Sequence, residues 1–284
     1  STEKGVITNL QFVKATRAEL AEDDVEIRVA ATGLNFRDVM DALGMYPGKN
    51  EFFGLECAGV VERVGGGVSD VAVGDAVFGL AGDSFSSLAV TKASLVVRKP
   101  ASLTFAQAAT VPVAFLTAYH ALHNLADVQS GDKVLIHAAS GGVGMAATQL
   151  AKRAGCTVFG SSSATKRDAI VAMGVDHPVD SRSTSFSGEI LSLTNGTGVD
   201  VVLNSLSGGD FIEKTLSATK KEGTFIEIGK KDIWTPEQVA AHRDDLLYEA
   251  FDLLEVTRTE PGMIKAMFND IASKMESGDL SPLP

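Results

Sequence analysis

The sequence predicts an α/β protein in which a β-rich domain precedes a parallel sheet covered by helices. The chain has 284 residues, enough for two domains of ordinary size, and 45% of them are hydrophobic, as in proteins with a large core. Short apolar runs separated by glycine-rich turns dominate up to about residue 112. Beyond that point apolar runs alternate with helical patterns, which is typical of a parallel sheet.

The first part of the chain predicts mostly strands. Short apolar or alternating runs occur at 26–31, 57–64, 76–80 and 94–98. One helix is expected, over 36–43, because Gly44 ends the helical pattern. The segment 104–124 is apolar at helical spacing and leads out of this part of the chain. We assign residues 1–115 to the N-terminal part of a first, β-rich domain.

The most informative stretch is 133–147, which predicts a buried strand, a glycine turn and the start of a helix. A strand buried on both faces, followed by small residues, lets the backbone approach a pyrophosphate. Gly141 and Gly144 take the second and third glycine places of the dinucleotide fingerprint, and Ala139 takes the first, so the match is partial. The expected phosphate contacts are Ser140, Gly141, Gly142, Val143 and Gly144.

The next strand indicates which dinucleotide binds. A helix over 143–154 and a short strand over 156–160 complete a strand–helix–strand unit. About twenty residues after the glycines, an NAD site has an acidic residue for the ribose 2′-hydroxyl, but this chain has serines and two cations there. Such groups suit a 2′-phosphate, so we predict NADPH, held at this end by Ser161, Ser162, Lys166 and Arg167. For the two cations, an ordinary solvated helix start is the alternative.

The rest of the chain extends the same pattern. Strands are expected at 199–206 and 224–229, and helices at 208–219, 236–243 and 261–276. Ligands of open α/β sheets bind beyond the carboxyl ends of the strands, so we expect Asn204, Gly229 and Lys230 to contact the cofactor. For Asn204, a local strand-end cap is the alternative. We assign 116–249 to a Rossmann domain and 250–284 to a return to the first domain.

Charge and composition exclude several classes of function. The net charge of −11 argues against nucleic acid or an anionic membrane as the partner, because either needs clustered positive charge. No apolar run approaches the length of a membrane span, and the first residues do not form a signal peptide, so we expect a cytoplasmic protein. The two cysteines, Cys57 and Cys156, have no metal-ligand spacing and are expected to be core thiols.

Several segments, each weak alone, together form a specific pattern. They are Gly33–Asp38, Leu43–Gly48, Gly54–Gly59, Val73–Val77, His137–Gly144, Val202–Leu206 and Ile228–Lys230. In them the chain resembles the medium-chain reductase superfamily, and within it the enoyl reductase domains of modular polyketide synthases and animal fatty acid synthase. The resemblance implies a GroES-like substrate domain with a Rossmann domain, and NADPH-dependent reduction of an enoyl thioester.

The same superfamily contains zinc alcohol dehydrogenases, which this chain resembles less. These enzymes place a Cys in the first of the segments above and a Gly-His-Glu in the third. This chain has Asn35 and Leu55 at the two ligand positions. Without a thiolate and an imidazole there is no tetrahedral zinc site. The resemblance therefore implies a zinc-free fold and metal-free hydride transfer to a polarised double bond.

The resemblance also implies candidate catalytic residues. Tyr46 and Lys230 are candidate proton donors, since a phenol and an ammonium are both protonated at pH 7. The Tyr46 position is implied to govern the face of α-protonation when the substrate carries an α-methyl group. Asp252, an acceptor when ionised, is expected to orient Lys230. Asn35 is expected to position the nicotinamide or the thioester, with a helix cap as the alternative.

The implied partners are an acyl carrier protein bearing an enoyl-phosphopantetheine and neighbouring synthase domains in the same polypeptide, with no nucleic acid and no membrane. Three alternatives stay open at this point. One is a free-standing quinone or alkenal reductase of the same superfamily. Another is a variant in which the enolate of a γ-halogenated substrate closes a cyclopropane. The third is an NADPH-binding protein without turnover.

Overall fold

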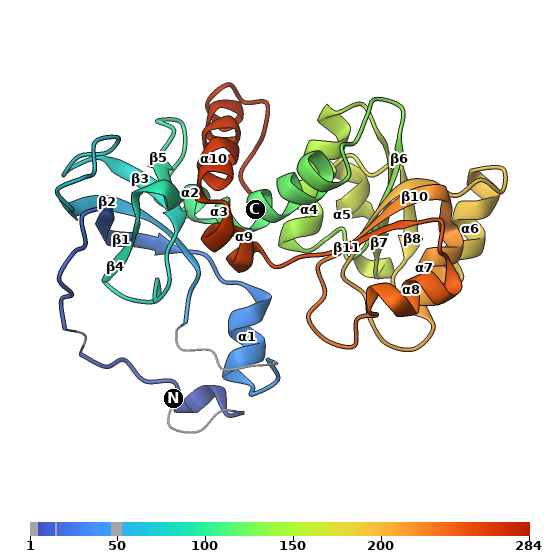
Figure 1. Cartoon of the computed structure of the whole chain (residues 1–284), viewed down its shortest axis with the longest axis horizontal. Helices are drawn as coiled ribbons and strands as arrows, with labels where there is room; N and C mark the ends of the chain where they lie inside the picture. The colour runs from blue at the N-terminus through green and yellow to red at the C-terminus, as the bar shows by residue number, and fades with distance from the viewer. Residues whose placement is uncertain (1–4, 15, 47–52) are drawn as a thin grey trace. The chain divides into compact units, whose positions relative to one another are not determined.

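The computed structural model describes residues 5–14, 16–46 and 53–284 and divides the chain into two compact units (Figure 1). The first unit comprises Ser1–Leu116 and Val256–Pro284, and the second comprises Thr117–Glu255. Both combine sheet and helix, as the sequence predicts for an α/β protein. No described helix is both long and apolar enough to cross a membrane.

The first unit is built on a five-stranded sheet in the order β4-β1-β2-β3-β5, with all neighbours antiparallel. Its strands are β1 (Asp24–Thr32), β2 (Glu56–Val64), β3 (Ala76–Leu80), β4 (Leu88–Lys92) and β5 (Val96–Arg98). Alternate side chains, among them Val25, Ile27 and Val61, form its core. Helices α1 (Phe36–Ala42) and α2 (Phe105–Ala109) and the short 3₁₀-turns at Ile7–Asn9 and Ala93–Leu95 complete the N-terminal part.

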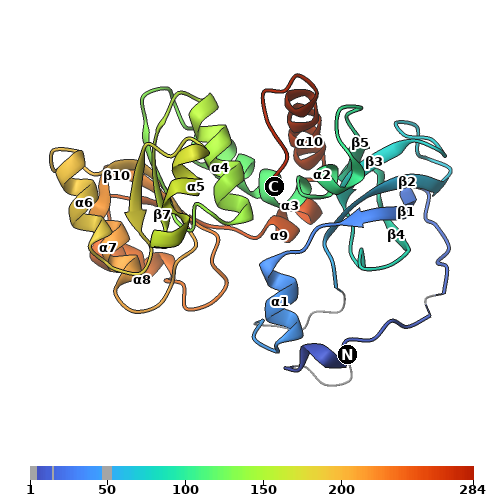
Figure 2. The same ribbon diagram turned by 180° about the vertical axis from the view of Figure 1, so that it is seen from behind.

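The last helix, α10 (Pro261–Glu276), returns to this sheet from the far end of the chain (Figure 2). The Phe268 ring packs edge-on against Phe78, with 5.9 Å between centroids. Lys265 Nζ donates to the backbone oxygens of Ala93 at 2.9 Å and Val96 at 2.6 Å. These contacts make the C-terminal segment part of the first unit, after α9 (Leu253–Thr259).

The second unit is a six-stranded parallel sheet in the order β11-β10-β9-β6-β7-β8. Its strands are β6 (Lys133–Ile136), β7 (Thr157–Ser162), β8 (His177–Asp180), β9 (Val199–Asn204), β10 (Thr219–Glu227) and β11 (Leu247–Ala250). The strand order reverses between β6 and β9, the place where such sheets bind dinucleotides. The Rossmann architecture predicted from the glycine turn is confirmed.

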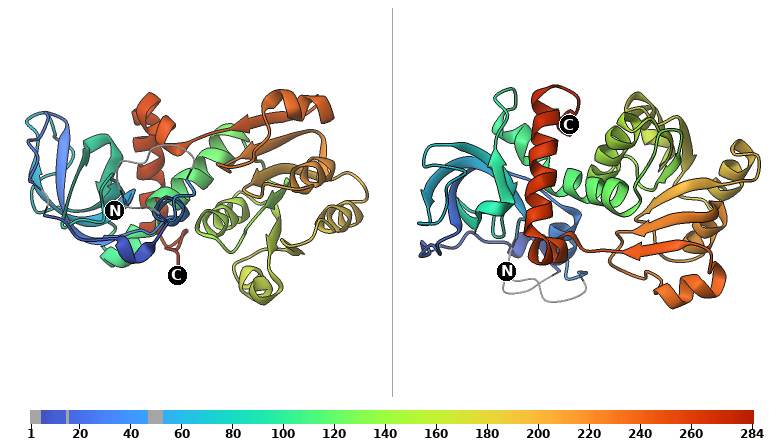
Figure 3. Two further views of the ribbon diagram at one scale, coloured as in Figure 1. Left: turned by 90° about the horizontal axis from the view of Figure 1, so that it is seen from below. Right: turned by 45° about the horizontal axis from the view of Figure 1, so that its top comes forward.

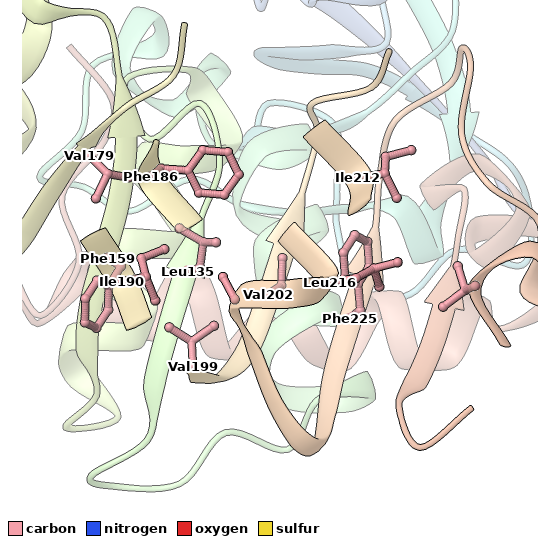
Figure 4. Packing of buried hydrophobic residues seen from close by; sticks show 12 residues of the cluster. Leu135, Phe159, Val179, Phe186, Ile190, Val199, Val202, Ile212, Leu216 and Phe225 are labelled. Atoms are coloured by element: carbon pink, nitrogen blue, oxygen red, sulfur yellow. The ribbon is translucent and has the colours of Figure 1, made fainter. Parts of the chain in front are cut away.

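Helices cover the parallel sheet on its two faces (Figure 3). They are α4 (Gly142–Arg153), α5 (Arg167–Ala172), α6 (Phe186–Leu193), α7 (Phe211–Ala218) and α8 (Pro236–His242), with a 3₁₀-turn at Ala164–Lys166. Figure 4 shows a buried core of this unit, in which Phe186 and Leu216 from the helices pack with Leu135 and Val202 from the strands. Because parallel strands are buried on both faces, their sequences are almost continuously apolar.

The segment 104–124, which is apolar at helical spacing in the sequence, forms more than one helix. It forms α2, then α3 (Pro112–Tyr119), and ends in a six-residue π-helix (His120–Leu125). Thr104 and Gln107 cap the start of α2 reciprocally. Pro112 has no N–H to continue α2, so a new helix begins there. The strands β4, β8 and β11 were not expected from the sequence.

Candidate active site

The glycine turn after β6 presents backbone amides at the start of a helix. Ala138 has a left-handed backbone (φ 50°), and the Gly141 N–H donates to Ala138 O at 2.8 Å. Gly141 is the N-cap of α4, yet no side chain caps the helix there. Gly141 and Gly142 are exposed. The first-turn amides of a twelve-residue helix therefore face solvent without a side-chain cap, which is what a pyrophosphate requires.

Gly144 has a different task from the other glycines of the turn. A Cβ atom at this position would lie 2.4 Å from Ala138 O and 2.6 Å from Ala139 Cα. Only a residue without a side chain lets α4 pack this closely on the end of β6, as in the third glycine of the dinucleotide fingerprint. The geometry of the turn therefore fits a bound dinucleotide.

At the end of β7, two of the four predicted 2′-phosphate ligands are buried and two are exposed. Ser161 is fully buried, and its Oγ accepts the Ala138 N–H at 3.0 Å. Ser162 is 2% exposed and donates to Ser163 O at 3.2 Å. Lys166 and Arg167 are exposed, as the prediction requires.

The side chains of Ser163 and Thr165 are further candidates for the 2′-phosphate. Their hydroxyl oxygens lie 3.2 Å apart next to the exposed cations. In the sequence they are simply two more hydroxyl residues of the same run. The register of β7, which runs to Ser162, decides which of the serines point inward.

His137, which precedes the glycine turn, stabilises it through side-chain hydrogen bonds. It is buried, with its Nδ1 3.0 Å from Ser161 Oγ and its Nε2 3.0 Å from Thr215 Oγ1. Burial lowers the pKa of His137 to about 3, so the ring is neutral at pH 7. The histidine therefore has a structural role, linking β6, β7 and α7.

Lys230 and Asp252 form an ion pair just beyond the carboxyl ends of β10 and β11. Lys230 Nζ lies 3.2 Å from Asp252 Oδ2 and donates to Phe251 O at 3.1 Å. The other carboxylate oxygen of Asp252 accepts the Leu254 N–H at 2.9 Å at the start of α9. Asp252 is thus held on one side by a helix terminus and holds the ammonium on the other. About a third of the Lys230 side chain is exposed, so a substrate can reach the ammonium.

Asn204 lies at the end of β9 with its side chain completely buried. Its amide donates to Leu206 O at 3.0 Å and to Glu227 Oε2 at 2.5 Å. Glu227 Oε1 accepts the Gly229 N–H at 2.6 Å. Glu227 was not predicted as a site residue, because its only signal in the sequence is a carboxylate that ends an apolar strand. Asn204, Gly229 and Lys230 all lie near the strand edge that carries the glycine turn, because β6, β9 and β10 are parallel.

The first unit contains the other two predicted catalytic residues. Asn35 precedes α1, and its Nδ2 donates to Glu56 Oε1 at 2.7 Å. Glu56 is 4% exposed, its Oε2 accepts the Val113 N–H at 2.8 Å, and burial raises its pKa to about 7. Asn35 is therefore oriented by a buried carboxylate that the sequence analysis did not single out. Leu55, which precedes Glu56 in the chain, is also buried.

Tyr46 is half-buried, and its ring faces the cationic side chain of Arg37. The Arg37 guanidinium carbon lies 5.2 Å from the centre of the Tyr46 ring. Pro47 and Gly48, which completed the tyrosine motif, lie outside the described residues. In the part of the chain that the structure describes, no three His, Cys, Asp or Glu side chains are placed to hold a metal ion.

Comparisons with known families cover most of the chain. The model of the alcohol dehydrogenase GroES-like domain matches residues 21–121, and that of the zinc-binding dehydrogenases matches residues 142–273. A putative inactive phenolphthiocerol synthesis polyketide synthase of Mycobacterium tuberculosis is 46% identical over 97% of this chain. The chain spans less than a fifth of the curated relatives that it matches, 17% in this case.

Solved structures resemble the chain over its whole length. The CurK enoyl reductase has a TM-score of 0.94 at 43% identity, covering all of this chain and 89% of that one. The CurF cyclopropanase from the curacin A biosynthetic pathway has a TM-score of 0.92 at 38% identity, covering 99% and 88%. A mycobacterial protein solved in complex with NADPH has a TM-score of 0.88 at 28% identity, covering 98% and 88%.

Proposed function

As the chain belongs to the enoyl reductase domains of polyketide synthases, within the medium-chain dehydrogenase/reductase family, we propose that it reduces the α,β double bond of an enoyl thioester with NADPH. The substrate is presented on an acyl carrier protein by its phosphopantetheine arm, with neighbouring synthase domains in the same polypeptide. The chain is an oxidoreductase, and the thioester, the carrier and NADPH are the proposed specifics.

The observation that carries the proposal is the Lys230–Asp252 pair at the edge of the sheet that also carries the glycine turn. A cofactor on that turn would bring its reactive end toward the carboxyl ends of the strands. A proton donor held there by a carboxylate is what reduction of an activated double bond needs beside the hydride source. The NADPH complex of a 28% identical structural neighbour supports the choice of cofactor.

In the proposed mechanism, the turn at Gly141–Gly144 with Lys166 and Arg167 would hold NADPH, which would supply a hydride to the β-carbon of the enoyl thioester. The π electrons of the double bond move toward the thioester carbonyl, giving an enolate. Lys230 donates a proton to the α-carbon and recovers one from water, which its partial exposure allows. Asp252 keeps the ammonium in place. The sum is one enoyl thioester, one NADPH and one proton giving the saturated thioester and NADP⁺.

The test is to follow NADPH oxidation with a crotonyl or 2-methyl-enoyl thioester, on a carrier protein and on a small thiol, with NADH and a quinone as controls. Consumption with the thioester and not with the quinone is the expected result. Turnover of the quinone alone would place the chain among the quinone reductases. NADPH binding without any turnover would favour the non-catalytic alternative.

A second candidate reaction is favoured by the structural neighbour described as a cyclopropanase. With a halogen on the γ-carbon, the α-carbon of the same enolate would displace halide from the γ-carbon and close a three-membered ring. Product analysis with a γ-chloro-enoyl thioester separates the two reactions. The saturated chloride alone supports simple reduction, and a cyclopropane with released chloride supports ring closure.

Replacing Lys166 and Arg167 together by alanine is expected to weaken NADPH binding about 30-fold and to leave NADH binding unchanged. Both side chains are exposed after β7, and each charge-assisted contact to a phosphate contributes about 1 kcal/mol. Fluorescence titration with the two nucleotides measures the ratio. NADH serves as the internal control because it lacks only the 2′-phosphate. Equal weakening of both nucleotides would contradict the assignment.

Replacing Tyr46 by phenylalanine is expected to change the configuration at the α-carbon of a 2-methyl substrate and to slow reduction by less than about tenfold. The ring under Arg37 would stay in place, and only the hydroxyl would be lost. Chiral analysis of the product measures the effect. The control is Tyr248→Phe, which removes a hydroxyl bonded to Trp234 O at 2.7 Å in the other unit. Unchanged configuration in Tyr46→Phe would contradict the predicted role of the tyrosine in selecting the face of the α-carbon that is protonated.

A further inference from the structure

Glu227 is a buried carboxylate that has no role in the proposed mechanism. It is the last residue of β10, follows the fully buried Phe225 and Ile226, and is itself 1% exposed. Burying a carboxylate is costly unless hydrogen bonds compensate for the lost water. The groups that donate hydrogen bonds to Glu227 therefore indicate the role of its negative charge.

Both oxygens of Glu227 accept hydrogen bonds from groups at the predicted cofactor edge. Oε2 accepts from Asn204 Nδ2 at 2.5 Å, and Oε1 accepts the Gly229 N–H at 2.6 Å. One partner ends β9, and the other begins the turn that leads to Lys230. A single carboxylate thus connects two neighbouring strand ends through two donors.

Only an ionised carboxylate suits both partners. A glutamine or a protonated glutamate would turn an N–H or O–H donor toward another donor, and one of the two hydrogen bonds would be lost. The two partners are themselves fixed, because Asn204 also donates to Leu206 O at 3.0 Å. The orientation of the Asn204 amide and of the Gly229 peptide therefore depends on the charge of Glu227.

We propose that Glu227 is a positioning residue for the cofactor: through Asn204 and the Gly229 N–H it holds the backbone at the ends of β9 and β10 in the arrangement that binds the dinucleotide. The inference deepens the proposed function and rests on it for the identity of the cofactor. Glu227 acts through Asn204 and Gly229 and is not placed against the reacting atoms.

The charge of Glu227 changes within the range in which the protein can be studied. Burial raises its pKa to about 7, while the hydrogen bonds from Asn204 and Gly229 and the charge of Lys230 oppose the rise. Tyr248 also interacts with Glu227, and its pKa is raised to about 12, so the phenol stays neutral. Below pH 7 the protonated form grows, and we expect the cofactor to bind more weakly.

The experiment measures the Kd of NADPH and NADH by fluorescence between pH 6 and 8.5. In the wild type we expect both constants to rise as the pH falls through about 7. NADH is included because it has no 2′-phosphate to titrate. In Glu227→Gln we expect binding at pH 8.5 to be about tenfold weaker, and NADH binding to depend less on pH than in the wild type. The matched control is Glu249→Gln on the neighbouring strand β11, an exposed carboxylate whose removal changes neither property.

A second readout needs no cofactor and keeps the test separate from the proposed function. In the apoprotein, the side-chain amide resonance of Asn204 is expected to shift with an apparent pKa near 7, and to lose this shift in Glu227→Gln. Wild-type nucleotide affinity and pH dependence in a folded Glu227→Gln variant would overturn the inference. If that variant does not fold, an Asn204 resonance that stays constant from pH 6 to 8.5 in the wild type would also overturn the inference. Absence of any NADPH binding in a wild type that shows the shift would overturn the proposed cofactor instead.

Discussion

Replacing Lys230 by methionine is expected to slow reduction of an enoyl thioester by a factor of about 10² to 10³, equivalent to about 3 to 4 kcal/mol in the barrier. Methionine keeps the length and apolar stem of the side chain but has no proton to give. The Asp252 carboxylate, 3.2 Å from the lost ammonium, remains held by the Leu254 N–H. The fold should therefore be unchanged, and the loss should appear in kcat with little effect on thermal unfolding.

The neighbouring lysine offers a matched control. Lys231 is exposed, and Lys231→Met makes the same chemical change one residue along the turn. Its rate should remain within about twofold of the wild type. Asp252→Asn should slow reduction by about tenfold, because the ammonium loses the charged partner that holds it in place. Equal losses of rate in Lys230→Met and Lys231→Met would show that the turn needs positive charge in general. Wild-type kinetics in Lys230→Met would exclude Lys230 as the proton donor.

Features predicted correctly from the sequence have local signals. The turn at 139–144 combines small residues, a preceding apolar run and a helical pattern, all within fifteen residues. The Rossmann order then follows, because parallel strands need covering helices between them. The exposed β11 and the proline-containing β8 lack the apolar run of a buried strand, and for this reason they were missed.

Features that the sequence could not predict depend on contacts between distant residues. Asn35 and Asn204 were identified by position, but their partners Glu56 and Glu227 lie 21 and 23 residues away. An isolated glutamate in a strand is usually solvated, and only the fold makes these two buried. Ser161 shows the converse, since its hydroxyl is turned inward to the glycine turn although its sequence context resembles that of Ser163.

Replacing Gly144 by alanine is expected to destabilise the protein by at least about 2 kcal/mol and to weaken NADPH binding more than tenfold. The added Cβ would lie 2.4 Å from Ala138 O and 2.6 Å from Ala139 Cα, and both are backbone atoms that cannot rotate away. Helix α4 would have to move off the end of β6. That motion displaces the uncapped amides at Gly141 and Gly142, so stability and affinity should fall together in urea unfolding and nucleotide titration.

The same substitution elsewhere in this unit should act in the opposite direction. Gly188 is exposed within α6, and a Cβ there meets no atom within 4 Å. Gly188→Ala should therefore stabilise the protein by about 0.5 to 1 kcal/mol through the greater helix propensity of alanine, with no effect on NADPH. The contrast separates the loss of a glycine from the loss of close backbone contact. If Gly144→Ala were as stable as the wild type and bound NADPH normally, the close packing of α4 on the strand would not be what shapes the cofactor turn.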